Sequence, residues 1–159
     1  MTNLKTTGNV WIFQGDTKKY DITTMLGNID IANEFHWKVS RYRGNIHAGD
    51  IGLIWLAGNH AGIYAVTQIL SNPDFQSETE AERRYWLRDA EDRTELRVKM
   101  KLITNLAGNP ITRDEIKRVS GLEELSIIKS PKGTNFKVSA DEWQLIGELI
   151  AKHQVLATS

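Results

Sequence analysis

Cysteine is absent from this chain of 159 residues, and so are long apolar runs. Without cysteine the chain can form no disulfide, thiol nucleophile or cysteine-bound zinc site. No apolar run approaches the length that crosses a bilayer, and the first residues lack the apolar core of a secretory signal. The formal net charge is zero, so the chain should not coat nucleic acid without specificity. These absences favour a cytoplasmic protein with no membrane partner.

Catalytic and metal-binding motifs are equally scarce. The chain has no Walker glycine loop, HExxH, GxSxG or EF-hand loop, and its 4 histidines are too scattered for a typical metal site. His47 and Asp50 flank Gly49 and could form the acid–base pair of a small hydrolase. A Gly-Asp pair before a strand is more often a turn in which the Asp accepts nearby amides. We therefore expect no catalytic residue, no metal and no cofactor, with the hydrolase kept as an alternative.

Apolar periodicity predicts an α+β fold. Short apolar or alternating segments predict strands, over residues 9–14, 35–39, 50–56, 61–70 and 96–102. Helical spacing and capping boxes predict helices, over residues 16–28, 112–119 and from Ser139 onward. This order of elements fits a curved or barrel-like sheet flanked by helices. We expect one domain over residues 1–159, with 154–159 as a tail or linker.

Two of these elements allow a prediction of which face is buried. In the strand over 96–102, the apolar positions alternate with Arg97, Lys99 and Lys101, which we expect on the polar face. In the last helix one stripe is formed by Trp143, Ile146, Ile150 and His153. Capping boxes are predicted at Thr112 with Glu115 and at Ser139 with Glu142.

Aromatic and basic residues are the most informative part of the chain. Of the 5 tryptophans, Trp11 and Trp143 follow apolar patterns and are expected in the core. Trp37 and Trp55 border loops, so the residues alone leave them open between core packing and a platform for base stacking. Residues 36–50 are rich in Lys and Arg, which suits a grip on a few phosphates or an ordinary solvated face.

An ordered set of segments resembles the EVE family, which belongs to the PUA-like superfamily and is related to YTH domains. The segments are WIFQ…KKYDI, HWKVSRYRGNIHAGD, GLIWLAGNHAGIYAVTQI and SPKGTNF. The resemblance extends from Val10 to about Leu149. It implies a single EVE domain with a PUA-like, partly open curved β-barrel of five to six strands flanked by helices.

The resemblance also implies a function. EVE domains resemble non-catalytic readers that hold a flipped, modified nucleobase in an aromatic pocket. In prokaryotes they often accompany restriction nucleases that target DNA carrying 5-methylcytosine or 5-hydroxymethylcytosine. We therefore expect binding to a modified cytosine, in DNA rather than RNA, and a nuclease effector as partner. The alternatives are a PUA-like RNA-binding domain, the small hydrolase, and a protein-interaction module.

Site residues follow from the same resemblance. The implied base pocket comprises Gln14, Trp37, Ser40, Trp55, Leu56, Ala57, Gly62, Trp86, Gly133, Thr134, Asn135 and Phe136. The implied contacts to the nucleic-acid backbone are Lys38, Arg41, Tyr42 and Arg43. Some eukaryotic relatives carry a charged motif where this chain has Phe13, Gln14 and Gly15. The Gln14 amide, which holds both a donor and an acceptor, can either contact a base edge or satisfy a strand end.

Overall fold

The computed structural model describes residues 8–87 and 94–158 and has eight strands and six helices within them. The strands are β1 (Val10–Asp16), β2 (Phe35–Lys38), β3 (Ile51–Ala57), β4 (Gly62–Ile69), β5 (Asp74–Gln76), β6 (Glu95–Asn105), β7 (Ile111–Thr112) and β8 (Asn135–Val138). The helices are α1 (Ile22–Leu26), α2 (Ile29–Ala32), α3 (Glu80–Arg83), α4 (Arg113–Lys117), α5 (Ser126–Lys129) and α6 (Ala140–Thr158). The predicted α+β class is confirmed.

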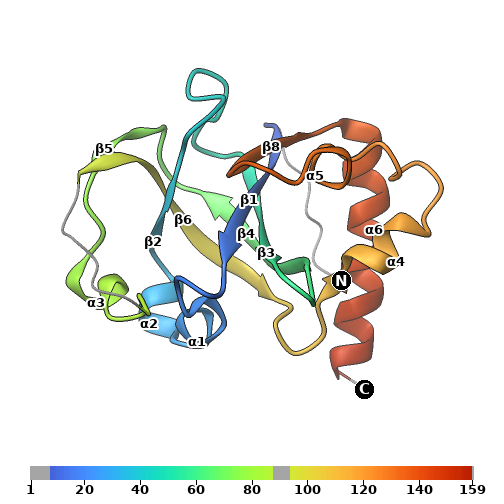
Figure 1. Ribbon diagram of the computed structural model, residues 1–159, viewed down its shortest axis with the longest axis horizontal. Helices are drawn as coiled ribbons and strands as arrows, with labels where there is room; N and C mark the ends of the chain where they lie inside the picture. Colours follow the sequence, from blue (N-terminus) through green and yellow to red (C-terminus); the bar gives the residue numbers. More distant parts are fainter. Residues whose placement is uncertain (1–7, 88–93, 159) are drawn as a thin grey trace.

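One mixed sheet organises the molecule (Figure 1). Its strand order is β2-β6-β4-β3-β1-β8, with β5 added beside β6 and β7 beside β4. The neighbours β1 and β3 are parallel, and the other pairs are antiparallel. The register shifts within the β3–β4 and β4–β6 pairs, and such bulges bend a sheet and increase its twist. The result is the curled, partly open barrel that the sequence predicts.

The two faces of the sheet bury separate hydrophobic cores. The inner core contains Trp11 and Phe13 from β1, Phe35 from β2, and apolar residues of α1. The outer core contains the alternate β1 residue Ile12 and is covered by the helices of the second half of the chain. In Figure 1, α4, α5 and α6 lie together on this side of the sheet, while α1 and α2 close the other end. Alternation along each strand thus supplies apolar side chains to both cores.

The last helix follows the sequence prediction closely. Ser139 Oγ accepts from the Glu142 amide, and Glu142 Oε1 accepts from the Ser139 amide, which completes a capping box. Ile146, Ile150 and His153 on the predicted stripe are buried. The helix continues to Thr158, so residues 154–158 are helical, and their role as a tail or linker stays a prediction. No described helix combines the length and apolar character needed to span a membrane.

Three local predictions need correction. The helix predicted over 16–28 is confined to Ile22–Leu26. Thr112 caps the amide of Glu115 as expected, but the Glu115 carboxylate accepts instead from His153 Nε2 at 2.8 Å. The predicted capping box is therefore only half formed, because the carboxylate joins α4 to α6.

The third correction concerns β6. Arg97 lies on the side opposite Val98, as alternation predicts, yet it is buried at 7 % exposure. The segment from Asp74 to Trp86 packs over this part of the polar face and supplies partners to the guanidinium. A local period-two pattern cannot reveal a covering segment of this kind.

A side-chain amide bridges the two end strands of the sheet. Asn135, at the start of β8, is fully buried. Its Oδ1 accepts from the backbone amides of Ser40 at 2.7 Å and Arg41 at 3.1 Å, and its Nδ2 donates to Lys38 O at 3.2 Å. These bonds replace part of a backbone ladder and hold the end of β2 against β8, so the barrel is closed here without strand pairing.

Candidate functional site

A cavity of about 290 Å³ lies beside this bridge, between the end of β1, strand β2 and the segment that precedes β6. Its lining comprises Gln14, Gly15, Asp16, Lys19, Tyr20, Ile22, His36, Trp37, Lys38, Glu78, Trp86, Glu95, Arg97 and Thr134. The volume lies near the lower end of typical small-ligand pockets, which enclose roughly 300–1,000 Å³. A cavity of this size suits one small planar ligand better than a large one.

Two tryptophans line the cavity, and each is supported by another aromatic ring. The Trp37 ring meets Phe35 with centroids 6.4 Å apart at 72°, and the Trp86 ring meets Tyr20 at 4.8 Å and 67°. These edge-to-face contacts stabilise the rings and fix their orientation. Both tryptophans remain only partly buried. They can therefore offer an aromatic surface to a ligand.

A glycine in β1 leaves room for one of these rings. A Cβ built on Gly15 would lie 2.5 Å from Ile22 Cδ1 and 2.9 Å from Trp37 Cζ2. Both distances are shorter than a normal carbon contact, so the missing side chain lets the indole lie directly against the strand. The sequence therefore needs glycine at this position if Trp37 is to stay in place.

Short-range bonds position Trp86. Helix α3 starts with a complete capping box between Thr79 and Glu82, and the amide of Trp86 donates to Arg83 O just after it. The indole Nε1 donates to Glu78 Oε1 at 3.0 Å. Trp86 also forms a β-bridge with Tyr20. The indole is thus held by its backbone, its N–H group and a ring neighbour.

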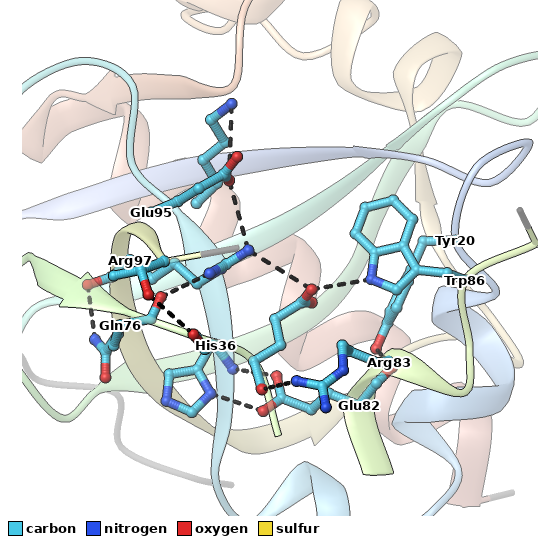
Figure 2. A network of polar contacts seen from close by, with 12 residues as sticks. Tyr20, His36, Gln76, Glu82, Arg83, Trp86, Glu95 and Arg97 are labelled. Carbon is cyan, nitrogen blue, oxygen red and sulfur yellow. Dashed lines mark hydrogen bonds and ion pairs between the residues drawn. The ribbon is translucent and has the colours of Figure 1, made fainter. Parts of the chain in front are cut away.

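An acidic and basic network forms one side of the cavity (Figure 2). Arg97 Nη1 donates to Gln76 O at 2.6 Å, while Nη2 lies 3.5 Å from Glu95 Oε2 and 3.6 Å from Glu78 Oε1. Burial raises the pKa of Glu78, and the bonds from Trp86 and Arg97 oppose this effect. The guanidinium thus lies close to the two carboxylates of the lining that are largely buried.

A second buried carboxylate ties β2 to α3. Glu82 Oε1 lies 2.7 Å from His36 Nδ1, and Glu82 Oε2 accepts from the His36 amide at 2.8 Å. Burial raises the pKa of Glu82, but the bonds from His36 and Thr79 outweigh it and leave the pKa below its ordinary value. The ionised carboxylate therefore stabilises the contact that places α3 beside the cavity.

Cationic side chains lie at the rim. Lys19 and Lys38 line the cavity and are exposed, and Lys38 forms only a long ion pair of 3.9 Å with Glu95. Arg41, three residues beyond β2, is also exposed, and its guanidinium lies 5.1 Å from the Tyr42 ring centroid. Exposed cations in this position can contact phosphates without entering the cavity.

Five of the predicted site residues line this cavity. They are Gln14, Trp37, Lys38, Trp86 and Thr134. Gln14 Nε2 donates to Pro131 O and Gly133 O in the loop that precedes β8. Its N–H groups therefore hold this loop and are not available to a base. The amide nitrogen thus has a structural role, whereas contact of Gln14 with a base edge stays a prediction.

Other predicted pocket residues lie elsewhere. Trp55 is 2 % exposed in the outer core, so the prediction that it forms a pocket floor is wrong. Residues of α4, α5 and α6 pack in the same core, and the pattern within β3 does not show which face of the strand these helices cover. Leu56 is buried in the inner core and Phe136 in the outer core. Gly62 allows close packing, because a Cβ there would lie 2.2 Å from Ile111 O.

The remaining predicted residues border the site without lining it. Ala57 is partly buried at the end of β3. Ser40 and Asn135 form the bridge between the end strands, and Gly133 accepts from Gln14. Tyr42 has a φ of 60° and packs on Trp11 with centroids 5.0 Å apart. These residues support the rim more than they form the cavity.

Arg43, the last residue predicted to contact the nucleic-acid backbone, is exposed in the loop that also contains Tyr42. Asp50 is buried, and its carboxylate accepts from the amides of Asn9 and His47 and from Trp11 Nε1 at 2.8 Å. The turn interpretation of Asp50 is confirmed, because these bonds occupy both of its oxygens. His47 is exposed and contacts Asp50 through its backbone amide.

Several lining residues were not predicted, above all Glu78, Glu95 and Arg97. One signal was present: Thr79-x-x-Glu82 is a capping box that predicts a helix next to Trp86. Within residues 8–87 and 94–158, no cluster of three or more His, Asp or Glu side chains is arranged to hold a metal.

Comparison with known proteins identifies the family. The EVE domain model matches residues 9–149. The chain belongs to the EVE domain family. No curated protein sequence matches this EVE protein.

Solved structures share its PUA-like fold. A hypothetical protein from Leishmania major has a TM-score of 0.65 at 13 % identity, covering 92 % of this chain and 97 % of that chain. A protein from Agrobacterium tumefaciens has a TM-score of 0.64 at 16 % identity, covering 89 % and 92 %. Human THYN1, solved in complex with 5-methylcytosine-containing DNA, has a TM-score of 0.58 at 8 % identity, covering 89 % and 97 %.

Proposed function

We propose that this EVE protein binds DNA carrying a modified base and holds the everted base in the cavity between Trp37 and Trp86. The observation that carries the proposal is the combination of two supported indoles in a cavity of about 290 Å³ with exposed lysines at its rim. A base has two flat faces and a polar edge, and the sugar and phosphates to which it is attached are solvated. The cavity offers matching surfaces to each part.

The energies are compatible with this mode of binding. Stacking of a base on an aromatic side chain contributes about 1–3 kcal/mol. Everting a base costs a few kcal/mol, so two aromatic contacts together offset most of that cost. Phosphate contacts from Lys19, Lys38 and Arg41 would add affinity that falls with salt. The chain then acts as a non-catalytic reader.

A modified cytosine is the proposed target, with DNA preferred to RNA. The support is the family and the fold shared with human THYN1, whose structure contains 5-methylcytosine DNA. We extend the proposal to a restriction system in the cytoplasm, in which the reader directs a nuclease effector to modified DNA. Co-purification of a nuclease with the reader, and cleavage that requires both components, would test this extension.

Tryptophan variants test the central proposal. Duplexes with one 5-methylcytosine or one cytosine are titrated with wild type, Trp37→Ala, Trp86→Ala and Phe75→Ala. Phe75 is a matched control because it is 61 % exposed and outside the cavity lining. Loss of one stacking contact should weaken binding of the modified duplex about 5- to 150-fold, from about 1–3 kcal/mol. Phe75→Ala should bind as wild type does.

The result that contradicts the proposal is equally clear. Folded Trp37→Ala and Trp86→Ala variants that bind the modified duplex with wild-type affinity would exclude the cavity as the base site. A matched RNA probe separates the two nucleic acids, since they differ at the 2′-hydroxyl. Tighter binding to modified RNA than to modified DNA would favour the RNA-binding alternative.

A further inference from the structure

We propose that Glu78 reads the polar edge of the everted base and selects bases that carry an exocyclic amine, so that a cytosine binds and a thymine is rejected. This inference rests on the proposed function, because it assigns a specificity residue to the same cavity. It identifies the chemical group that distinguishes one base from another, which aromatic stacking cannot do.

The position of the carboxylate favours this role. Glu78 lines the cavity, and its side chain is 12 % exposed. Oε1 accepts from Trp86 Nε1 at 3.0 Å and lies 3.6 Å from Arg97 Nη2. These two contacts orient the carboxylate beside one of the proposed stacking surfaces. A ligand that stacks on the Trp86 indole therefore lies close to a fixed acceptor.

The second carboxylate oxygen is available. No hydrogen bond or ion pair reaches Glu78 Oε2 from any described residue. In the described part of the chain, no fully buried side-chain nitrogen or oxygen lacks a partner. Oε2 therefore keeps some accessible surface, and Glu78 is one of the residues that line the cavity.

The other charged groups of this network are already engaged. Glu95 Oε2 lies 3.5 Å from Arg97 Nη2 and 3.9 Å from Lys38 Nζ. Arg97 Nη1 donates to Gln76 O. Glu78 differs from Glu95 because it also accepts from the Trp86 indole and is less exposed, at 12 % against 27 %, so it is the lining carboxylate that is fixed beside a stacking surface.

Base chemistry converts this geometry into selectivity. The N4 amine of cytosine donates hydrogen bonds, whereas O4 of thymine only accepts them. An ionised carboxylate also only accepts. Cytosine therefore completes a hydrogen bond to Oε2, whereas thymine would place one acceptor against another. A well-formed polar contact of this kind discriminates by about 1–3 kcal/mol, which corresponds to about 5- to 150-fold in affinity.

The experiment compares two bases that share a ring and a 5-methyl group. One duplex carries 5-methylcytosine and the other carries thymine, each opposite an abasic site so that base pairing does not contribute. Wild type should bind the 5-methylcytosine duplex at least about 5-fold more tightly. Glu78→Gln keeps an oxygen for the Trp86 indole and replaces Oε2 by an N–H donor. The affinity ratio, defined as affinity for the 5-methylcytosine duplex divided by affinity for the thymine duplex, should fall below one in this variant. The reason is that the new N–H donor can bond to O4 of thymine.

A matched control separates hydrogen bonding from charge. Glu34→Gln also removes one negative charge, but Glu34 lies outside the cavity lining and pairs with Lys99 Nζ at 3.1 Å. Its affinity ratio should remain that of wild type. A change in ratio that is equal in both variants would overturn the assignment to Glu78.

The outcomes distinguish this inference from the proposed function. Equal affinity of wild type for the two duplexes overturns the inference directly, and this test does not depend on whether any variant folds. Suppose that folded Glu78→Gln keeps the wild-type ratio of affinities for the two duplexes while Trp86→Ala binds the 5-methylcytosine duplex weakly. This result overturns the role of Glu78 and leaves the base site intact. Unchanged binding in Trp37→Ala and Trp86→Ala overturns both.

Discussion

Removal of the Asn135 amide should open the seam between the two end strands. In Asn135→Ala, the backbone amides of Ser40 and Arg41 lose their acceptor, and Lys38 O loses its donor. These are the only side-chain bonds among the described residues that join the end of β2 to β8. Among the described strands β2 pairs only with β6, so no described strand pairing replaces these bonds.

The expected cost follows from these bonds. A neutral intramolecular hydrogen bond contributes about 1 kcal/mol net, so three lost backbone bonds predict about 3 kcal/mol of lost unfolding free energy. Asn135 is fully buried, so Ala also leaves unfilled volume at this position. Water can reach the exposed Ser40 and Arg41 and should recover part of the loss. Typical domains are stable by about 5–15 kcal/mol, so the variant should remain folded.

Urea unfolding followed by tryptophan fluorescence measures this cost, and hydrogen exchange locates it. The Ser40 and Arg41 amides should exchange faster in Asn135→Ala than in wild type. Asn72→Ala is the control, because exposed Asn72 accepts one bond, from the Ala48 amide at 2.8 Å. It should lose less than about 1 kcal/mol. A loss in Asn135→Ala no larger than in the control, with unchanged exchange, would refute the role of the bridge.

Two further changes test the supports of the cavity. Gly15→Ala should displace the Trp37 indole, because the new Cβ would lie 2.9 Å from its Cζ2. Binding of a 5-methylcytosine duplex should then weaken by about tenfold if one stacking contact is lost. Wild-type affinity in this variant would show that binding does not require the ring at this position. The Glu82 pKa lies below its ordinary value of 4.5, so its contribution to stability is present at neutral pH and is lost as the pH falls through the folded-state pKa. The difference in urea midpoint between wild type and Glu82→Gln should therefore shrink from pH 7 to pH 3, and a constant difference would contradict this.

The fold was largely predictable because it depends on local patterns that are clear in the sequence, namely alternation in strands and capping boxes at helix starts. The alternation around Val98 and the continuous apolar segments of β3 and β4 predict strands, and these strands form the sheet. The Ser139–Glu142 capping box predicts the start of α6 within one residue. Each of these signals arises from residues close together in sequence.

The candidate site was less predictable because its parts come from distant segments. Trp37 and Trp55 look alike in sequence, since each lies in a strand that leads into a loop. The structure separates them, because Trp37 lines the cavity and Trp55 is buried in the outer core with residues of α4, α5 and α6. Arg97 and Glu78 are 19 positions apart, and their contact forms only when the segment before β6 folds back over the strand. No periodic pattern of apolar residues in the sequence predicts that this segment folds back over β6.

The location of the cavity follows from how the barrel is left open. A continuous backbone ladder between β2 and β8 would fill the space beside Trp37 and Thr134, whereas an unbridged gap would expose the inner core to water. The Asn135 amide joins the strands at one level, at the end of β2, and leaves the space at Trp37 open. Edge strands normally expose unpaired backbone groups, which proteins cover or protect. Here a single side chain protects part of the edge, and the unpaired remainder borders the cavity that we propose receives a base.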